Sequence, residues 1–182
     1  MSHMLQRCSI LVVAGVFFDE PTTSHYLLEI SKKSSLAHTS VKTYLKQLKK
    51  LLIVQESVEK KGSRKFPLYH ANIESHQYRK YKRLYNIFRL EESGLIDYLK
   101  DRLTPKSMVL FGSYARGEDI KDSDIDIFLE SKKTMLELAH FEKQLKRRIQ
   151  LHIKEHISEC PKEIKNNIIN GINLSGYLEV FK

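Results

Sequence analysis

The spacing of apolar residues predicts a helical start to the chain. Four residues recur at helical spacing and predict a buried first helix: Ile10, Val13, Ala14 and Phe17. Ser24 is suited to cap a second helix, which the polar residues 31–35 should end. The clearest helix is 38–51, where one face carries Val41, Tyr44, Leu45, Leu48 and Leu51. Three helices are therefore expected before residue 52.

A short hairpin is predicted to follow the third helix. Residues 53–58 and 66–70 have the composition of strands, and the polar residues 60–65 between them supply the turn. Because Pro67 lacks the amide hydrogen that a central strand needs, the second strand of the hairpin is expected at a sheet edge.

The second half of the chain alternates between helical and extended patterns. Residues 168–174 have the pattern of a helix end followed by a short strand. The overall mixture is typical of an α+β protein. Strands are predicted at 108–111, 124–129 and 148–153, and helices at 74–103 and 134–146.

Composition narrows the class of protein. The 182 residues are 41% hydrophobic and 29% charged, as in a folded soluble protein. Cys8 and Cys160 form no CxxC pair, which argues against a disulfide scaffold or a cysteine-based zinc module and favours a reducing, cytoplasmic location. The apolar run 8–18 is followed by no signal-peptide cleavage site, and no stretch is long enough to span a membrane.

The excess of positive charge is confined to the first half. Residues 1–90 hold 16 Lys and Arg against six Asp and Glu, a net charge of +10, whereas residues 91–182 hold 15 against 16. Such a distribution indicates a polyanionic partner for the first half, most simply nucleic acid. In the second half, the run 146–148 (Lys-Arg-Arg) is interpreted as a solvated helix end, with contact to a primer or tRNA as the alternative.

Residues 8–72 resemble a winged helix-turn-helix domain, in which three helices precede a basic hairpin. In that family the third helix enters the major groove of DNA, and the hairpin touches phosphate or the minor groove. A solvated helix face and a protein-docking role are the alternatives for the same residues. The resemblance implies nucleic-acid contacts by Lys42, Lys46, Lys49, Lys61, Arg64 and Lys65.

Candidate chemistry is concentrated in residues 108–130. Gly112 and Ser113 directly follow an apolar strand, where a glycine lets phosphate approach the backbone and a serine can donate hydrogen bonds. Asp124 and Asp126 lie two residues apart on the next strand, so both carboxylates face one side. Paired carboxylates repel unless a cation lies between them, and Mg²⁺ (or Mn²⁺) takes oxygen ligands of this kind together with substrate phosphates.

The order Gly-Ser, ten residues, Asp-x-Asp is similar to the signature of the nucleotidyltransferase superfamily that includes DNA polymerase beta. The resemblance covers residues 95–182 and is greatest to the minimal nucleotidyltransferases. It implies that Asp124 and Asp126 bind two Mg²⁺ ions together with a third carboxylate from a later strand. The phosphates of an NTP would contact Gly112, Ser113 and Arg116.

The third carboxylate of that family has no counterpart at the expected place. Gln150 stands where an aspartate is expected, and its neutral amide can offer oxygen to a metal but cannot act as a base. His152 shares a strand face with Gln150 and could serve as a base instead. Glu155 is an odd number of residues away and would face the other side. The residues are compatible with turnover and equally with nucleotide binding alone.

The sequence thus predicts three parts. These are a winged helix in 1–73, a helical linker in 74–104, and a small nucleotidyltransferase domain in 105–182 with a mixed sheet packed by helices. The expected activity is Mg²⁺-dependent transfer of an NMP from an NTP to an RNA 3′ end, such as that of tRNA, or to a protein hydroxyl. The alternative is a DNA-binding transcriptional regulator or antitoxin-like protein, with homodimers expected, whose second domain only binds nucleotide or a partner.

Overall fold

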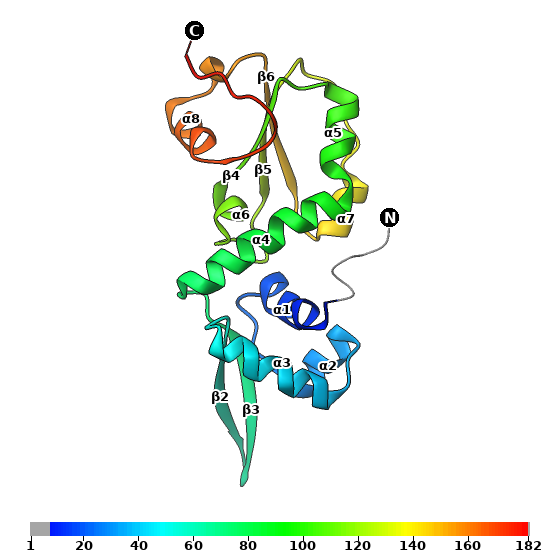
Figure 1. The fold of residues 1–182 in the computed structure, drawn as a ribbon, viewed down its shortest axis with the longest axis vertical. Coiled ribbons are helices and arrows are strands. Elements are labelled where there is room, and N and C mark those ends of the chain that lie inside the picture. Colours follow the sequence, from blue (N-terminus) through cyan, green and yellow to red (C-terminus); the bar gives the residue numbers. More distant parts are fainter. Residues whose placement is uncertain (1–7, 182) are drawn as a thin grey trace. The chain divides into compact units, whose positions relative to one another are not determined.

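The computed structural model describes residues 8–181 and has α+β architecture. The chain divides into a first unit, Met1–Tyr85, and a second unit, Asn86–Lys182. The division falls inside helix α4 (His76–Ser93), which is drawn in green in Figure 1. Each unit has hydrophobic clusters of its own, and Tyr85 and Leu90 of α4 belong to different clusters. Among residues 8–181, no helix is long and apolar enough to cross a membrane.

The first unit packs three helices beside an antiparallel sheet of order β1-β3-β2. Its core is formed by the apolar faces that the spacing predicts, with Val41, Leu45 and Leu48 of the third helix all buried. The helices are α1 (Ser9–Asp19), α2 (Leu27–Ser34) and α3 (His38–Lys50). The strands are β1 (His25–Tyr26), β2 (Val54–Lys61) and β3 (Arg64–Ala71).

The second helix begins and ends later than predicted. Ser24 is not its cap, because His25 and Tyr26 form strand β1 and pair with β3 before the helix starts. The backbone N–H of Tyr26 then donates to the Glu29 carboxylate, 2.7 Å away, at the first turn. The polar segment does not break the helix where it was expected to, since Ser34 is still helical and its buried hydroxyl is satisfied by donating to the carbonyl of Ile30.

The prediction of an edge position for the second hairpin strand is wrong. β3 is the central strand, with β2 on one side and the two-residue β1 on the other. Pro67 is nevertheless tolerated, because it lies opposite Val58 of β2, and β1 pairs only with Leu68 and Tyr69. The missing N–H therefore falls beyond the end of β1.

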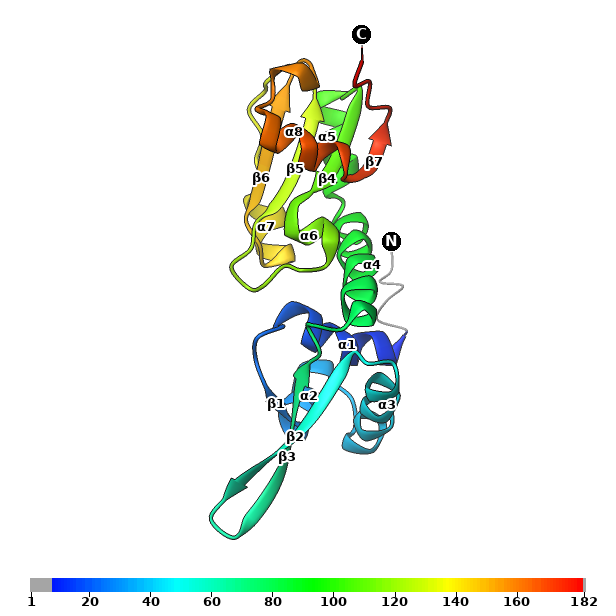
Figure 2. The ribbon, with the colours of Figure 1, turned by 90° about the vertical axis from the view of Figure 1, so that its left-hand side faces the viewer.

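The second unit contains a mixed four-stranded sheet of order β6-β5-β4-β7, in which only β5 and β6 are parallel (Figure 2). The strands are β4 (Ser107–Phe111), β5 (Ile125–Glu130), β6 (Ile149–Lys154) and β7 (Ile172–Gly176). The helices are α5 (Leu95–Leu103), α6 (Gly112–Arg116), α7 (Ala139–Leu145) and α8 (Lys162–Ile169), with the 3₁₀ turn η2 (Ile157–Glu159).

The helix predicted at 134–146 is shorter in the structure. It begins at Ala139, because the preceding residues are held by tertiary contacts rather than by helical hydrogen bonds. The N–H of Glu137 donates to the Tyr98 hydroxyl at 3.1 Å, and the side chains of Leu136 and Leu138 pack on the core. Tertiary packing has overridden a helical pattern here.

The two faces of this sheet are covered by different clusters. Ile125 and Ile127 of β5 pack in the cluster that includes the leucines of α5. Phe128 belongs to the other cluster, which includes Ile157 and Ile168. Since side chains alternate along a strand, Asp126 lies on the face of Phe128, at the start of β5.

Candidate active site

Gly112 is packed against a carboxylate. β4 ends at Phe111, which is paired with Asp126 of β5, and the chain then turns into α6 with a φ of +77° at Gly112. A Cβ atom at Gly112 would lie only 2.5 Å from Oδ2 of Asp126. Glycine is therefore required both for the left-handed backbone and for the close approach. Ser113 follows in the first turn of α6 and is partly exposed.

Asp124 and Asp126 stand at the start of β5. Asp126 is the second residue of the strand, with 24% of its side chain exposed, and Asp124 directly precedes the strand. The first residue of the strand, Ile125, donates its N–H to the carbonyl of Arg148 at 2.8 Å. This bond joins the beginning of β5 to the beginning of β6, so both aspartates lie at one end of the parallel pair.

The residue that reaches Asp126 from β6 is His152. Its Nε2 lies 3.5 Å from Oδ1 of Asp126, and this nitrogen is buried and has no hydrogen-bond partner within residues 8–181. The His152 ring also lies 5.0 Å, centroid to centroid, from that of Phe111. Gln150 is directly paired with Asp126 in the register of β5 and β6, and it is exposed. A neutral amide thus occupies the position opposite the carboxylate.

The donor set at this site fits a magnesium ion that is completed by substrate. No group of three or more His, Cys, Asp or Glu side chains in residues 8–181 is close enough to hold a metal ion alone. Mg²⁺ is usually held by one or two carboxylates together with substrate phosphates and water. Asp124 and Asp126 meet that requirement, and Gly112 leaves the Asp126 carboxylate open to a phosphate.

Arg116 forms a surface ion pair. It ends α6, and its Nε donates to Oε2 of Glu118 at 2.7 Å, with more than a third of each side chain exposed. Such exposed pairs contribute little stability and exchange readily for another anion. The structure therefore leaves Arg116 accessible on the helix that begins at Gly112.

A cavity of about 570 Å³ lies beside Asp124. It is formed by the segment before β5 and the segment before β6. The run 146–148, interpreted from sequence as a solvated helix end, lines this cavity. The cluster of basic residues was visible in the sequence, but the cavity that it lines was not. The lining residues are Lys121, Asp122, Ser123, Asp124, Glu142, Lys146, Arg147 and Arg148.

The basic residues singled out in the first unit fall into two groups. Lys49 forms an ion pair with Glu56, and the hydrogen bond that its ammonium donates to that carboxylate raises the pKa of Lys49. Lys61 lies 3.5 Å from Glu59, and its ammonium is 4.7 Å from the centre of the Tyr26 ring.

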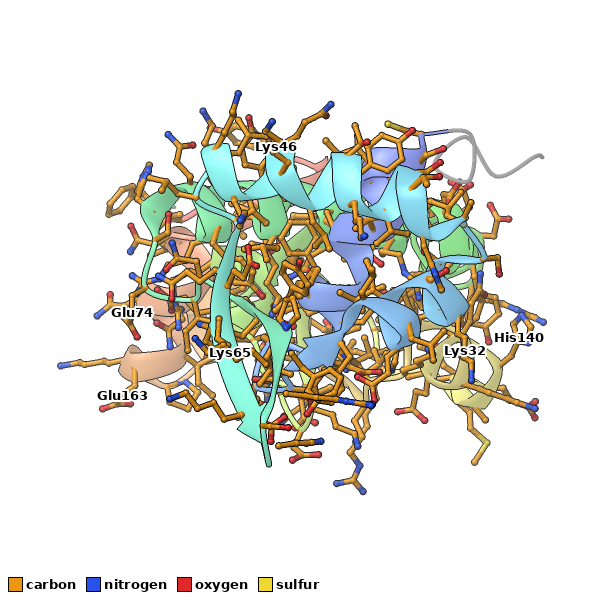
Figure 3. The ribbon with its side chains drawn as sticks, turned by 90° about the horizontal axis from the view of Figure 1, so that it is seen from below. Lys32, Lys46, Lys65, Glu74, His140 and Glu163 are labelled. Atoms are coloured by element: carbon orange, nitrogen blue, oxygen red, sulfur yellow. The ribbon has the colours of Figure 1, made fainter. Side chains whose placement is uncertain are left out.

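The other four residues are exposed and form no ion pair within residues 8–181. They lie on α3 and on the hairpin, and Figure 3 shows Lys46 projecting outward from α3 and Lys65 on the hairpin. These residues are Lys42, Lys46, Arg64 and Lys65.

Comparison with known proteins shows that part of the second unit is similar to nucleotidyltransferases. Residues 92–174 match the family model of the nucleotidyltransferase domain. Two curated relatives from Methanocaldococcus jannaschii, both provisionally named protein adenylyltransferases, are 62% identical over 32 residues and 50% identical over 44 residues. These matches cover 18% and 24% of this chain and span only 32% and 51% of the relatives' own lengths.

A solved structure is also similar in part. It is titled a possible transcriptional regulator from Methanosarcina mazei Go1, and it is 21% identical to this chain. The match covers 53% of this chain and 83% of the other, with a TM-score of 0.35. A likeness of this size carries no argument about fold or function.

Proposed function

From the nucleotidyltransferase domain match in residues 92–174, we propose that the protein transfers an NMP from an NTP to an acceptor hydroxyl with Mg²⁺ or Mn²⁺. The observation that carries this proposal is the packing of Gly112 against Asp126. It brings a backbone segment suited to phosphate within contact of a carboxylate suited to a divalent ion.

The transfer is a substitution at the α-phosphorus of the NTP. The acceptor oxygen forms a bond to that phosphorus, the bond to the bridging oxygen of pyrophosphate breaks, and the hydroxyl proton passes to water. Mg²⁺ held by Asp124 and Asp126 would neutralise phosphate charge and increase the acidity of the attacking hydroxyl.

The chain's own residues bind and orient the reactants. The Ser113 N–H and hydroxyl, together with Arg116, hold the phosphates at the start of α6. The imidazole of His152 packs beside the Asp126 carboxylate, with Nε2 3.5 Å from Oδ1, and limits the directions open to that carboxylate, while the Phe111 ring restricts the imidazole. His152 is therefore a positioning residue in this scheme.

Two classes of acceptor suit the proposal, an RNA 3′ end and a protein hydroxyl. The names of the curated relatives favour protein. The charge of the first unit favours nucleic acid, because residues 1–85 hold 15 Lys and Arg against six Asp and Glu, whereas residues 86–182 hold 16 of each.

The first unit is proposed to be a winged helix that binds nucleic acid. Support comes from the order of three helices and a hairpin, and from exposed basic side chains on both α3 and the hairpin. These are the two elements that enter DNA grooves or contact phosphate in that kind of domain. A helical linker would then be the segment 74–104, which in the structure comprises α4 and α5.

The second candidate is a DNA-binding regulator or antitoxin-like protein whose nucleotidyltransferase domain binds nucleotide or a partner without turnover. One observation favours it: the residue paired with Asp126 on β6 is the neutral Gln150. Such a regulator would bind one duplex sequence well above background, as a dimer on a palindrome.

The deciding experiment is label transfer from each α-³²P NTP with Mg²⁺ or Mn²⁺ to total cellular RNA and total cell protein. Asp124→Asn/Asp126→Asn removes the proposed ligands, and Asp97→Asn/Asp101→Asn is the matched control, since both of these aspartates are exposed on α5 and lie outside the proposed ligand set and the cavity lining. We expect label with the wild type and with Asp97→Asn/Asp101→Asn only. No label in any reaction, with NTP binding still detectable, would contradict transfer and support the regulator.

A further inference from the structure

The sheet order gives the active site two distinct sides. β5, which carries Asp126, lies between β4 and β6. Gly112 and the start of α6 follow β4, whereas Arg148 precedes β6 and accepts the N–H of Ile125. The proposed phosphate site is therefore on the β4 side of the aspartates, and the cavity lined by residues 146–148 is on the β6 side.

In-line transfer gives these two sides different roles. The attacking and leaving oxygens lie on opposite sides of the phosphorus in a phosphoryl transfer. If pyrophosphate leaves toward Gly112 and Ser113, then the acceptor approaches from the β6 side. The cavity beside Asp124, with a volume of about 570 Å³, is the space available to that acceptor.

The cavity presents three exposed basic side chains. Lys121, Lys146 and Arg148 line it, and none of them forms an ion pair within residues 8–181. Lys121 comes from the loop before β5, and the other two come from the loop before β6. Three such cations around one cavity are suited to phosphates rather than to an uncharged hydroxyl.

Of the other four charged side chains of the cavity, Arg147 and Glu142 are already engaged, while Asp122 and Asp124 add two carboxylates to its lining. The Arg147 guanidinium lies 3.6 Å from Asp119, with only 6% and 1% of the two side chains exposed. The Glu142 carboxylate accepts the N–H of Ile149 at 2.9 Å. Lys146 caps α7 with a φ of +56°, so the turn into β6 is tight. These contacts hold the loop in place around the three exposed cations.

Resting on the proposed transfer, we infer that this cavity is the acceptor site and that it binds the terminal phosphates of an RNA strand through Lys121, Lys146 and Arg148. The 3′ hydroxyl of the strand then lies beside Asp124. An RNA end carries its own phosphates next to the attacking hydroxyl, whereas a protein side chain carries none, so the three exposed cations of this cavity favour RNA.

The test compares two variants of the full chain with the wild type. Lys121→Gln/Lys146→Gln/Arg148→Gln removes the three cations of the cavity. The matched control removes three exposed lysines that do not line it, Lys106→Gln/Lys132→Gln/Lys162→Gln, with the same change of charge. The probes are a short RNA for transfer kinetics and the same RNA with a photoreactive 4-thiouridine at its 3′ end.

We expect the cavity variant to raise KM for RNA by about tenfold or more, and to lower the salt dependence of log(kcat/KM) by about two units, since single strands lose roughly 0.7 per phosphate contact. KM for the NTP should not change. The wild type and control should crosslink within residues 119–124 or 146–150, and the cavity variant should lose that crosslink.

Equal behaviour of the two variants, or crosslinks confined to residues 8–85, would overturn the assignment. Label on protein alone, unaffected by the cavity substitutions, would overturn it while leaving nucleotidyl transfer intact. A crosslink in the cavity that disappears in the cavity variant, with no transfer to any acceptor, would keep the RNA site and refute the proposed transfer instead.

Discussion

At the scale of single residues, Gly112 is where two constraints coincide. Gly112→Ala should cost about 1–2 kcal/mol for the left-handed backbone, and it should also displace Asp126, because the new Cβ would fall 2.5 Å from Oδ2. We expect the variant to lose NTP binding in calorimetry. Gly94→Ala is the control, since Gly94 has a φ of +75° but nothing within 4 Å of its Cβ position. Equal nucleotide binding by both variants would refute the close-approach argument.

Gln150 provides a gain-of-function prediction. Its position opposite Asp126 is where a third carboxylate could act as a base, so Gln150→Asp should increase the rate of transfer by about a hundredfold. The rate is measured with the labelled acceptor, and Gln150→Asn is the control of equal size. If the aspartate is no faster than the asparagine, the third carboxylate is not what limits turnover.

The local motif was predictable from sequence, and the family resemblance also singled out Gln150 and His152, but the register that places them beside Asp126 was not predictable. Gly112 and Ser113 follow a strand of continuous apolar residues, so both their place and their chemistry are visible in the chain. The contact between His152 and Asp126 depends on the register of β5 against β6, which pairs Asp126 with Gln150. No spacing within either strand specifies that register.

At the scale of elements, α3 should bind nucleic acid through some of its lysines more than others. Lys42→Gln/Lys46→Gln removes two exposed cations and should lower the salt slope of duplex binding by about two units. Lys49→Gln should lower the salt slope less than Lys42→Gln alone or Lys46→Gln alone, because Glu56 already pairs with Lys49. Fluorescence anisotropy at several salt concentrations measures both. Equal effects of all three lysines would show that the ion pair opens at no cost.

The elements differ in how well a sequence pattern predicts them. The third helix was predicted at 38–51 and spans His38–Lys50, because its apolar stripe is complete and both ends are polar. Strand β1 has two residues and no periodicity to detect, so its pairing displaced the start of α2. The start of α7 was set by Tyr98, a residue far away in the chain, through its hydrogen bond to Glu137.

At the scale of the whole molecule, charge and chemistry are divided between the units. Division at residue 85 assigns the entire net charge of +9 to the first unit and leaves the second with equal numbers of acidic and basic residues. A polyanionic ligand would therefore be attracted over distance by the first unit. Because the second unit has no net charge, it can attract an anion only through local groups of cations, such as the three beside Asp124.

The separate cores also predict that acid destabilises the units unequally. His25, in the first unit, is only 2% exposed, and burial is the main cause that lowers its pKa. Glu20 and Glu29 partly oppose this shift, and Lys33 adds to it. Because the pKa of His25 is lower in the folded than in the unfolded state, the unfolded chain takes up the proton first. This contribution to stability is complete above about pH 6.5 and is lost as the pH falls below it.

Calorimetry of the full chain at pH 7.5 and pH 5.5 should therefore show the melting transition of the first unit moving down in acid. Other groups also titrate between these two pH values, so the quantity to compare is the change in melting temperature of the first unit from pH 7.5 to pH 5.5. His25→Phe should make this change smaller than it is in the wild type. His140→Gln is the control, because His140 is an exposed histidine of the second unit and should leave the shift unchanged. If His25→Phe melts with the wild-type pH dependence, the buried imidazole is not the acid-sensitive group.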